Sequence, residues 1–209
     1  MAVVLRTGEF GDYYGSPYSS SFPCNRTQME VNATYIYNYL TSKGWTKESI
    51  SAMLGNMQAE SSINPGRWQS DNVGGGPAYG LVQWDPFTKY TDWCSSNGYS
   101  DPSEMDSGLA RILYELENKI QWYGTGKFSG MSFEDFSKST ENVSTLAVAF
   151  LLCYERPADQ SVGVQTFRGQ LANNWYTYLG GIPTPVNKKG KKKKYKFILF
   201  NKKRRLTNG

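Results

Sequence analysis

Apolar residues recur at spacings of three and four positions over most of this chain, which is the period of helices that bury one face. Gly44 supplies a stop signal, and Thr46 and Ser132 stand where side-chain caps of helices are expected. The segment TLAVAFLLCY, residues 145–154, is apolar on nearly every face and predicts a central buried helix. The pattern therefore predicts a mainly α protein with helices near residues 29–40, 50–57, 87–94, 105–120, 133–136, 145–154 and 167–178.

Three segments do not follow the helical period. Residues 1–26 are rich in Gly, Ser, Tyr and Pro and predict an irregular N-terminal arm. Residues 65–84 contain GGG and two prolines, which predicts a loop with at most a small β-hairpin region. Residues 182–209 predict a linker and a basic C-terminal tail. One folded domain is expected between them, over residues 27–181.

The charge of the chain is divided between two regions of opposite sign. The net charge is +5, yet residues 1–187 carry 12 basic and all 18 acidic residues, a net charge of −6. Residues 188–209 carry the other 11 basic residues and no acidic residue. Such a run is typical of a solvated tail, so specific nucleic-acid binding is not expected. The tail could equally approach anionic polymers of a cell wall.

The chain contains no histidine, which narrows the chemistry it can perform. Ser-His-Asp and Cys-His hydrolases and histidine-ligated zinc enzymes are excluded. The three cysteines have no CxxC spacing, and Cys94 and Cys153 occupy apolar helical positions, which favours buried reduced thiols. We expect no metal and no cofactor, and acid–base chemistry must depend mainly on carboxylates.

One carboxylate stands out in NMQAESSINPG, residues 56–66. Glu60 lies one turn beyond Met57, at the edge of an apolar stripe that predicts a buried helix. A carboxyl group at the rim of apolar packing is desolvated, which favours its protonated form and suits it to general acid catalysis. The alternative is an ordinary solvated glutamate at a helix end.

A second cluster follows in AYGLVQW, residues 78–84. The Gln83 amide is suited to hydrogen bonding with a sugar or acetamido group, and Tyr79 and Trp84 are suited to stacking on a pyranose ring. The alternative is an edge strand whose Leu81 and Trp84 face the core.

Together, GWTKESISAMLGNMQAESSINPGRWQ, YGLVQW and YERPA resemble the phage tail lysozyme family of the lysozyme-like superfamily. The resemblance covers about residues 27–180. It implies a glycosidase, a muramidase or lytic transglycosylase, that cleaves the β-1,4 bond between N-acetylmuramic acid and N-acetylglucosamine in peptidoglycan, with Glu60 as catalytic acid. It also implies a sugar cleft lined by Gln83, Tyr79 and Trp84, with Tyr154 and Glu155 as further cleft residues.

A second catalytic carboxylate is harder to find. Asp71, in the glycine-rich loop, is the candidate, because Asp85 is better explained as the cap of a helix that Pro86 begins. If neither reaches the cleft, an acetamido or hydroxyl group of the substrate could complete the reaction. Hydrolysis and transglycosylation therefore stay open.

The resemblance also implies a location at the tail tip of a virion, acting on the bacterial wall, with other tail proteins as partners through the N-terminal arm or the basic tail. No signal peptide and no membrane span is indicated, and a prophage-encoded or host-encoded hydrolase is the alternative. Family members can carry a zinc peptidase domain after the lysozyme domain, and this chain lacks its histidines. Two other functions stay open: a glycan-binding module without turnover and a structural tail protein.

Overall fold

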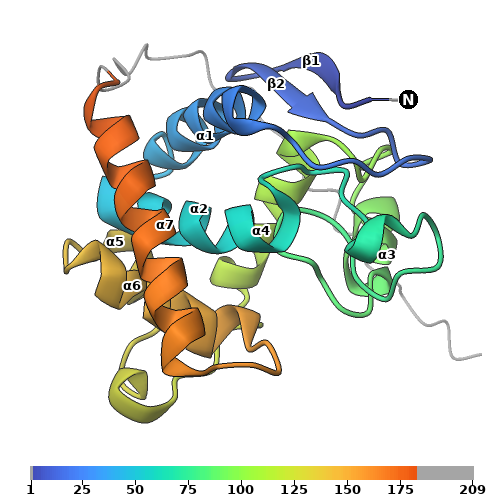
Figure 1. The fold of residues 1–209 in the computed structure, drawn as a ribbon. Coiled ribbons are helices and arrows are strands. Elements are labelled where there is room, and N and C mark those ends of the chain that lie inside the picture. Colours follow the sequence, from blue (N-terminus) through green and yellow to red (C-terminus); the bar gives the residue numbers. More distant parts are fainter. Residues whose placement is uncertain (1, 183–209) are drawn as a thin grey trace, which may run out of the picture.

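The computed structural model describes residues 2–182, and its helices surround one hydrophobic core (Figure 1). Of the predicted linker and tail, residues 182–209, all but residue 182 lie outside the described residues. The mainly α fold is confirmed. Its elements are β1 (Val4–Gly8), β2 (Gly11–Gly15), α1 (Arg26–Thr41), α2 (Lys47–Ser61), α3 (Thr88–Ser96), α4 (Met105–Glu117), α5 (Phe133–Lys138), α6 (Val143–Phe150) and α7 (Val162–Gly180). Short 3-10 turns at Gln69–Asp71 and Gly126–Phe128 and a π-helical turn at Leu151–Glu155 complete them.

The N-terminal segment was predicted to be irregular, but part of it is regular. Strands β1 and β2 form an antiparallel hairpin there. The register runs from Val4 opposite Gly15 to Gly8 opposite Gly11. The hairpin lies against α1 (Figure 1), and the Tyr13 side chain is buried. The predicted small sheet is therefore misplaced, since residues 65–84 contain only isolated bridges. Docking on α1 orders a segment whose Gly- and Tyr-rich composition suggested a loop.

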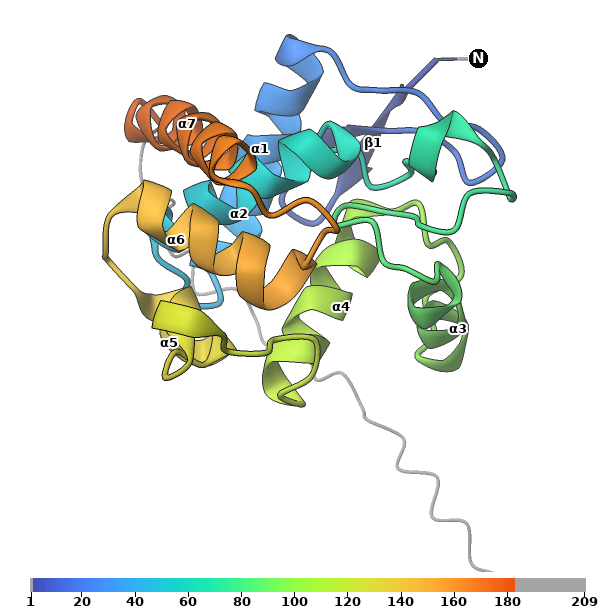
Figure 2. The ribbon, with the colours of Figure 1, turned by 60° about the horizontal axis from the view of Figure 1, so that its bottom comes forward.

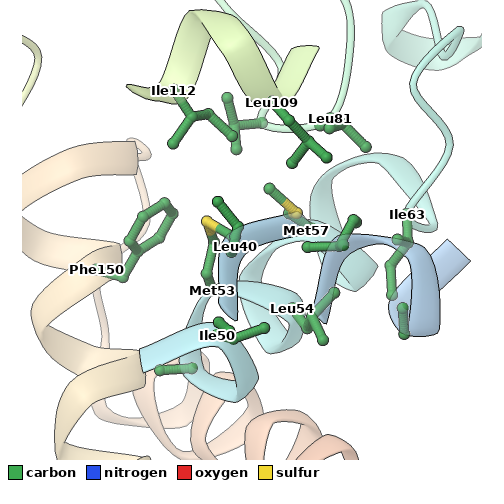
Figure 3. Packing of buried hydrophobic residues seen from close by; sticks show 14 of the residues in the cluster. Leu40, Ile50, Met53, Leu54, Met57, Ile63, Leu81, Leu109, Ile112 and Phe150 are labelled. Carbon is green, nitrogen blue, oxygen red and sulfur yellow. The ribbon is translucent and has the colours of Figure 1, made fainter. Parts of the chain in front are cut away.

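Helix α2 lies at the centre of the molecule, and every residue from 49 to 57 is buried. The predicted stripe of Ile50, Met53, Leu54 and Met57 is confirmed as core. Figure 3 shows these side chains meeting Leu40 of α1, Leu109 and Ile112 of α4, and Phe150 of α6. The stripe thus joins three helices that are far apart in the sequence.

The opposite face of α2 is made of small residues, and it receives α7. Gly55 lies so close to α7 that a Cβ added there would stand 2.6 Å from the Ala172 backbone nitrogen. Figures 1 and 2 show α7 lying across α2 and beside α6. The apolar segment at residues 145–154, which forms most of α6 and the turn after it, is buried as predicted. The central helix, however, is α2 and not α6.

Three details at the helix ends differ from the prediction. Helix α4 ends at Glu117, so Ile120 lies outside it and is exposed. Phe167 of α7 faces solvent instead of the core, being 51% exposed. Helix α3 begins at Thr88, so its N-cap position is occupied by Phe87, which makes no side-chain capping hydrogen bond. Asp85, two residues earlier, is therefore not the helix cap that the sequence predicted. By contrast, the caps expected at Thr46 and Ser132 are confirmed.

Two buried asparagines fasten the N-terminal segment to the turn after α2. The Asn32 amide accepts from Tyr14 N at 2.6 Å and donates to Ile63 O at 2.7 Å. Asn64 accepts from Ser16 N at 3.1 Å. Because these amides are buried, their pairing with backbone is worth more than a surface contact. The turn that follows Glu60 is therefore held from outside the helix.

The three cysteines, Cys24, Cys94 and Cys153, are all buried free thiols, which confirms the expectation for Cys94 and Cys153. Burial raises the pKa of Cys24 to about 12. Within residues 2–182, no helix has both the length and the apolar character needed to cross a membrane.

We predict that Gly55→Ala destabilises the protein, because the new methyl group would overlap the α7 backbone at Ala172. The expected loss is about 1–3 kcal/mol in the free energy of unfolding, the usual cost of overpacking. Urea unfolding followed by circular dichroism measures it. Gly163→Ala is the matched control, since its Cβ would meet nothing closer than 3.8 Å and alanine favours a helix. Equal stability of the two variants would contradict the prediction.

Candidate functional site

The end of α2 joins the two motifs that the sequence singled out. Glu60 lies in the last helical turn, and Ser62 ends the helix in the left-handed conformation, with φ 55°. Ser61 Oγ donates to Leu81 O at 2.8 Å. Gln83 Nε2 donates to Arg67 O at 3.0 Å, which ties the second motif to the turn that follows Glu60. The structure thus brings residues 56–66 and 78–84 into direct contact.

Glu60 is paired with a residue that sequence reasoning missed. Its carboxylate forms an ion pair with the Arg168 guanidinium of α7, and its side chain is 21% exposed. Arg168 is buried and also donates to Asn56 O at 2.7 Å. Glu60 is therefore neither a freely solvated glutamate nor an unpaired one. Arg168 lies on the same buried stripe of α7 as Leu171 and Trp175. A basic residue on an otherwise apolar helical stripe is unusual, and this pattern in the sequence could have identified Arg168 as a candidate.

Beside this ion pair lies a pocket of about 300 Å³. Its size is at the lower end of the roughly 300–1,000 Å³ that is usual for small-molecule sites. The pocket collects four of the predicted cleft residues, Gln83, Trp84, Tyr154 and Glu155. The other lining residues are Val82, Asp85, Lys89, Gln121 and Arg156. Glu60 is not one of the lining residues.

Glu155 connects the pocket with Glu60. It is half-buried, yet its Oε1 atom is fully buried and has no hydrogen-bond partner among the described residues. Burial raises the pKa of Glu155 well above its ordinary value, and the negative charge of Glu60 raises it further, while Arg168 opposes the shift. The pocket therefore has at its wall a carboxyl group whose environment favours the protonated form.

A second buried carboxylate, Glu115 of α4, supports the wall of the pocket. It accepts hydrogen bonds from Trp84 Nε1 at 3.0 Å, Arg111 Nε at 2.8 Å, and the Tyr154 hydroxyl. Burial raises the pKa of Glu115, and these three donors oppose the shift. Sequence analysis missed Glu115, although its spacing of four from Arg111 is that of a helical ion pair. The network fixes Trp84 and Tyr154 as parts of a rigid wall.

The predicted stacking residues do not present open faces. Tyr79 is fully buried, with its ring packed between Trp68 and Tyr90, so its predicted role as a stacking platform is wrong. Trp84 lines the pocket but is only 3% exposed, and its ring stacks on Tyr90 with centroids 4.3 Å apart. Both rings serve the core, the alternative that the sequence left open for Trp84.

An exposed aromatic residue lies near the pocket instead. Tyr123 is 58% exposed, and the guanidinium of Arg156, a pocket residue, lies 4.3 Å from its ring centroid. Tyr123 N donates to Cys153 O at 2.8 Å, and Gln121 Nε2 donates to Tyr154 O at 3.1 Å. These bonds hold the segment against the π-helical turn that carries Glu155. Sequence analysis did not single out Tyr123, because it lies outside both motifs.

The predicted second carboxylate, Asp71, has a different set of partners. It forms an ion pair with Arg67 at 2.6 Å and accepts from Ser21 Oγ at 2.7 Å. In the part of the chain that the structure describes, its polar contacts thus stay within the loop and the N-terminal segment. Asp85 does line the pocket, at its exposed rim.

Another pocket, of about 360 Å³, lies between the hairpin, α1 and α7. None of the predicted site residues lines it. Its acidic residues are already partnered, since Asp12 accepts from Thr7 and Glu30 pairs with Arg26. Among residues 2–182, no group of three or more His, Cys, Asp or Glu side chains is arranged to hold a metal ion.

Comparison with known proteins supports the resemblance seen in the motifs. A family model described as phage tail lysozyme matches residues 31–179. The chain is also 46% identical over 165 residues to "Morphogenesis protein 1" of Bacillus phage B103. That alignment covers 78% of this chain and 43% of the relative, so the chain spans less than half of the relative's length. The chain belongs to the phage tail lysozyme family.

Proposed function

We propose that this chain cleaves the glycan strands of peptidoglycan, between N-acetylmuramic acid and N-acetylglucosamine, with Glu60 as the catalytic acid. The observation that carries the proposal is the position of Glu60. It stands at the end of a helix whose residues 49–57 are all buried, and its charge acts on Glu155, which lines a pocket together with Gln83 and Tyr154. Membership of the phage tail lysozyme family supports the same chemistry.

The reaction requires a proton for the leaving oxygen and a nucleophile for the anomeric carbon. Glu60 supplies the proton to the glycosidic oxygen. Either water or the 6-hydroxyl of the muramyl residue then attacks, which gives a reducing or an anhydro end. Gln83 positions the sugar through the amide oxygen that its two Nε2 hydrogen bonds leave available.

We propose that the activity is used at the tail tip of a phage particle during entry into the host cell. The family supports a tail protein, and the name of the relative from Bacillus phage B103 supports a role in particle morphogenesis. The hairpin and the segment that follows it offer the surface by which other tail proteins would bind.

One observation favours a second candidate function, a glycan-binding module without turnover. The Glu60 carboxylate is already paired with the Arg168 guanidinium, so the group proposed as the acid has an ionic partner within the protein. In that case, the pocket would hold glycan, and no bond would be cut.

We predict that Glu60→Gln abolishes the release of soluble muropeptides from peptidoglycan, because glutamine cannot give up a proton to the leaving oxygen. The expected decrease is at least about 100-fold, the usual contribution of a general acid. Mass spectrometry of the digest measures it and separates reducing from anhydro ends.

The matched control is Glu134→Gln, an exposed glutamate that pairs with Lys138 on α5. It should digest as wild type does. If wild type binds glycan and releases no muropeptides from walls of several types, the binding module is the correct function.

We also predict that Tyr123→Ala raises the apparent KM for solubilised glycan strands by about 5-fold, which corresponds to roughly 1 kcal/mol of lost contact. The reason is the loss of the exposed ring beside the pocket. Steady-state kinetics measures it, with Phe22→Ala as the control for removing an exposed aromatic ring in the N-terminal segment. An unchanged KM in Tyr123→Ala would exclude sugar stacking at this position.

A further inference from the structure

We infer that Glu155 is the second carboxyl group of the reaction, and that Glu60 and Glu155 hold one proton between them. This inference rests on the proposed function, because it assigns Glu155 as the group from which the catalytic acid, Glu60, receives its proton. It replaces Asp71 with a residue whose side chain lines the pocket itself.

The position of Glu155 is built into the fold. It ends the π-helical turn Leu151–Glu155, and Arg156 follows in the left-handed conformation, with its N–H donating to Leu151 O at 2.8 Å. The bonds from Tyr123 and Gln121 described above hold this turn from the other side. Glu155 Oε1 is nevertheless left buried and without a partner in the described structure. A buried oxygen of this kind is costly unless it is protonated or meets a ligand.

The charges around Glu155 come from several elements. Glu60 of α2 and Glu115 of α4 are negative, and Arg168 of α7 is positive. Asp85, Lys89 and Arg156 line the same pocket, and all three are exposed to solvent. Glu115 has its own partner in Arg111.

Two neighbouring acids, Glu60 and Glu155, therefore share a single buried cation, Arg168. Like charges at close range make one of two carboxyl groups retain a proton. Arg168 forms its ion pair with Glu60, whereas Glu155 Oε1 is buried without a partner among the described residues and burial raises the pKa of Glu155, so the proton rests on Glu155 in the free enzyme.

The pair can then pass one proton through a complete cycle. The O–H bond of Glu155 breaks as the proton moves to Glu60, and Glu60 protonates the glycosidic oxygen as its bond to the anomeric carbon breaks. Water or the muramyl 6-hydroxyl bonds to that carbon and returns its own proton to the pair. One proton leaves the pair and one returns, in hydrolysis and in transglycosylation alike.

The pH dependence of wild type and Glu155→Gln tests this inference. We expect Glu155→Gln to lower kcat at least about 100-fold. We also expect its remaining activity to disappear at lower pH than in wild type, because the variant lacks the buried carboxyl group whose environment favours the protonated form. A purely structural role would lower the rate without moving the alkaline limb. Wild-type kcat with an unmoved limb would overturn the inference while leaving the proposed function intact.

Thermal unfolding provides a readout that does not depend on activity. A carboxyl group whose pKa is raised in the folded protein contributes stability below its unfolded pKa, and this contribution is lost as pH rises through the folded value. The melting temperature of wild type should therefore fall relative to Glu155→Gln as pH increases, while Glu134→Gln follows wild type. A constant difference would exclude the retained proton. If this shift is seen and wild type still releases no muropeptides, the proposed function and the catalytic role of Glu155 both fail, and only the shared proton stands.

Discussion

The burial of residues 49–57 of α2 on all sides is the constraint on which the rest of this structure depends. A helix that is apolar on one face and small on the other can be enclosed by α1, α4 and α6 on the first face and approached closely by α7 on the second. The fit at Gly55 fixes the position of α7 along α2. It thereby decides which residue of α7 stands opposite Glu60. The ion pair with Arg168 is thus a consequence of how two helices pack.

The same enclosure explains why a charged pair persists at this place. Glu60 lies at the C-terminal end of α2, where the helix dipole disfavours a negative charge. Arg168 offsets that cost and also satisfies a backbone carbonyl of the same helix. Removing either partner would leave an uncompensated charge in a place of limited solvent access, which is strongly destabilising in proteins. The site is held by packing and electrostatics together.

Much of the fold could be predicted because the helices and their caps are determined by residues that are close together in the sequence. The stripe of Ile50, Met53, Leu54 and Met57 and the cap at Thr46 are short-range patterns, and both are present in the structure. The hairpin was missed because its order comes from docking on α1. Likewise, Gln83, Trp84, Tyr154 and Glu155 line one pocket, whereas the partner of Glu60, Arg168, comes from a helix that is distant in the sequence. Whether an aromatic ring such as Tyr79 faces solvent or core depends on which elements cover it, and no spacing in the sequence carries that information.

The asparagine bonds at the N-terminus have a consequence for what counts as one folding unit. The family match begins at residue 31, in the first turns of α1, yet Asn32 and Asn64 take hydrogen bonds from the backbone of residues 14 and 16. A protein trimmed to the region of similarity would retain both amides in the interior and lose these partners. Each unpaired buried group costs about 1–3 kcal/mol. The smallest autonomous form of this domain therefore extends upstream of residue 31, and the strands ahead of α1 belong to the architecture of the domain as much as its helices do.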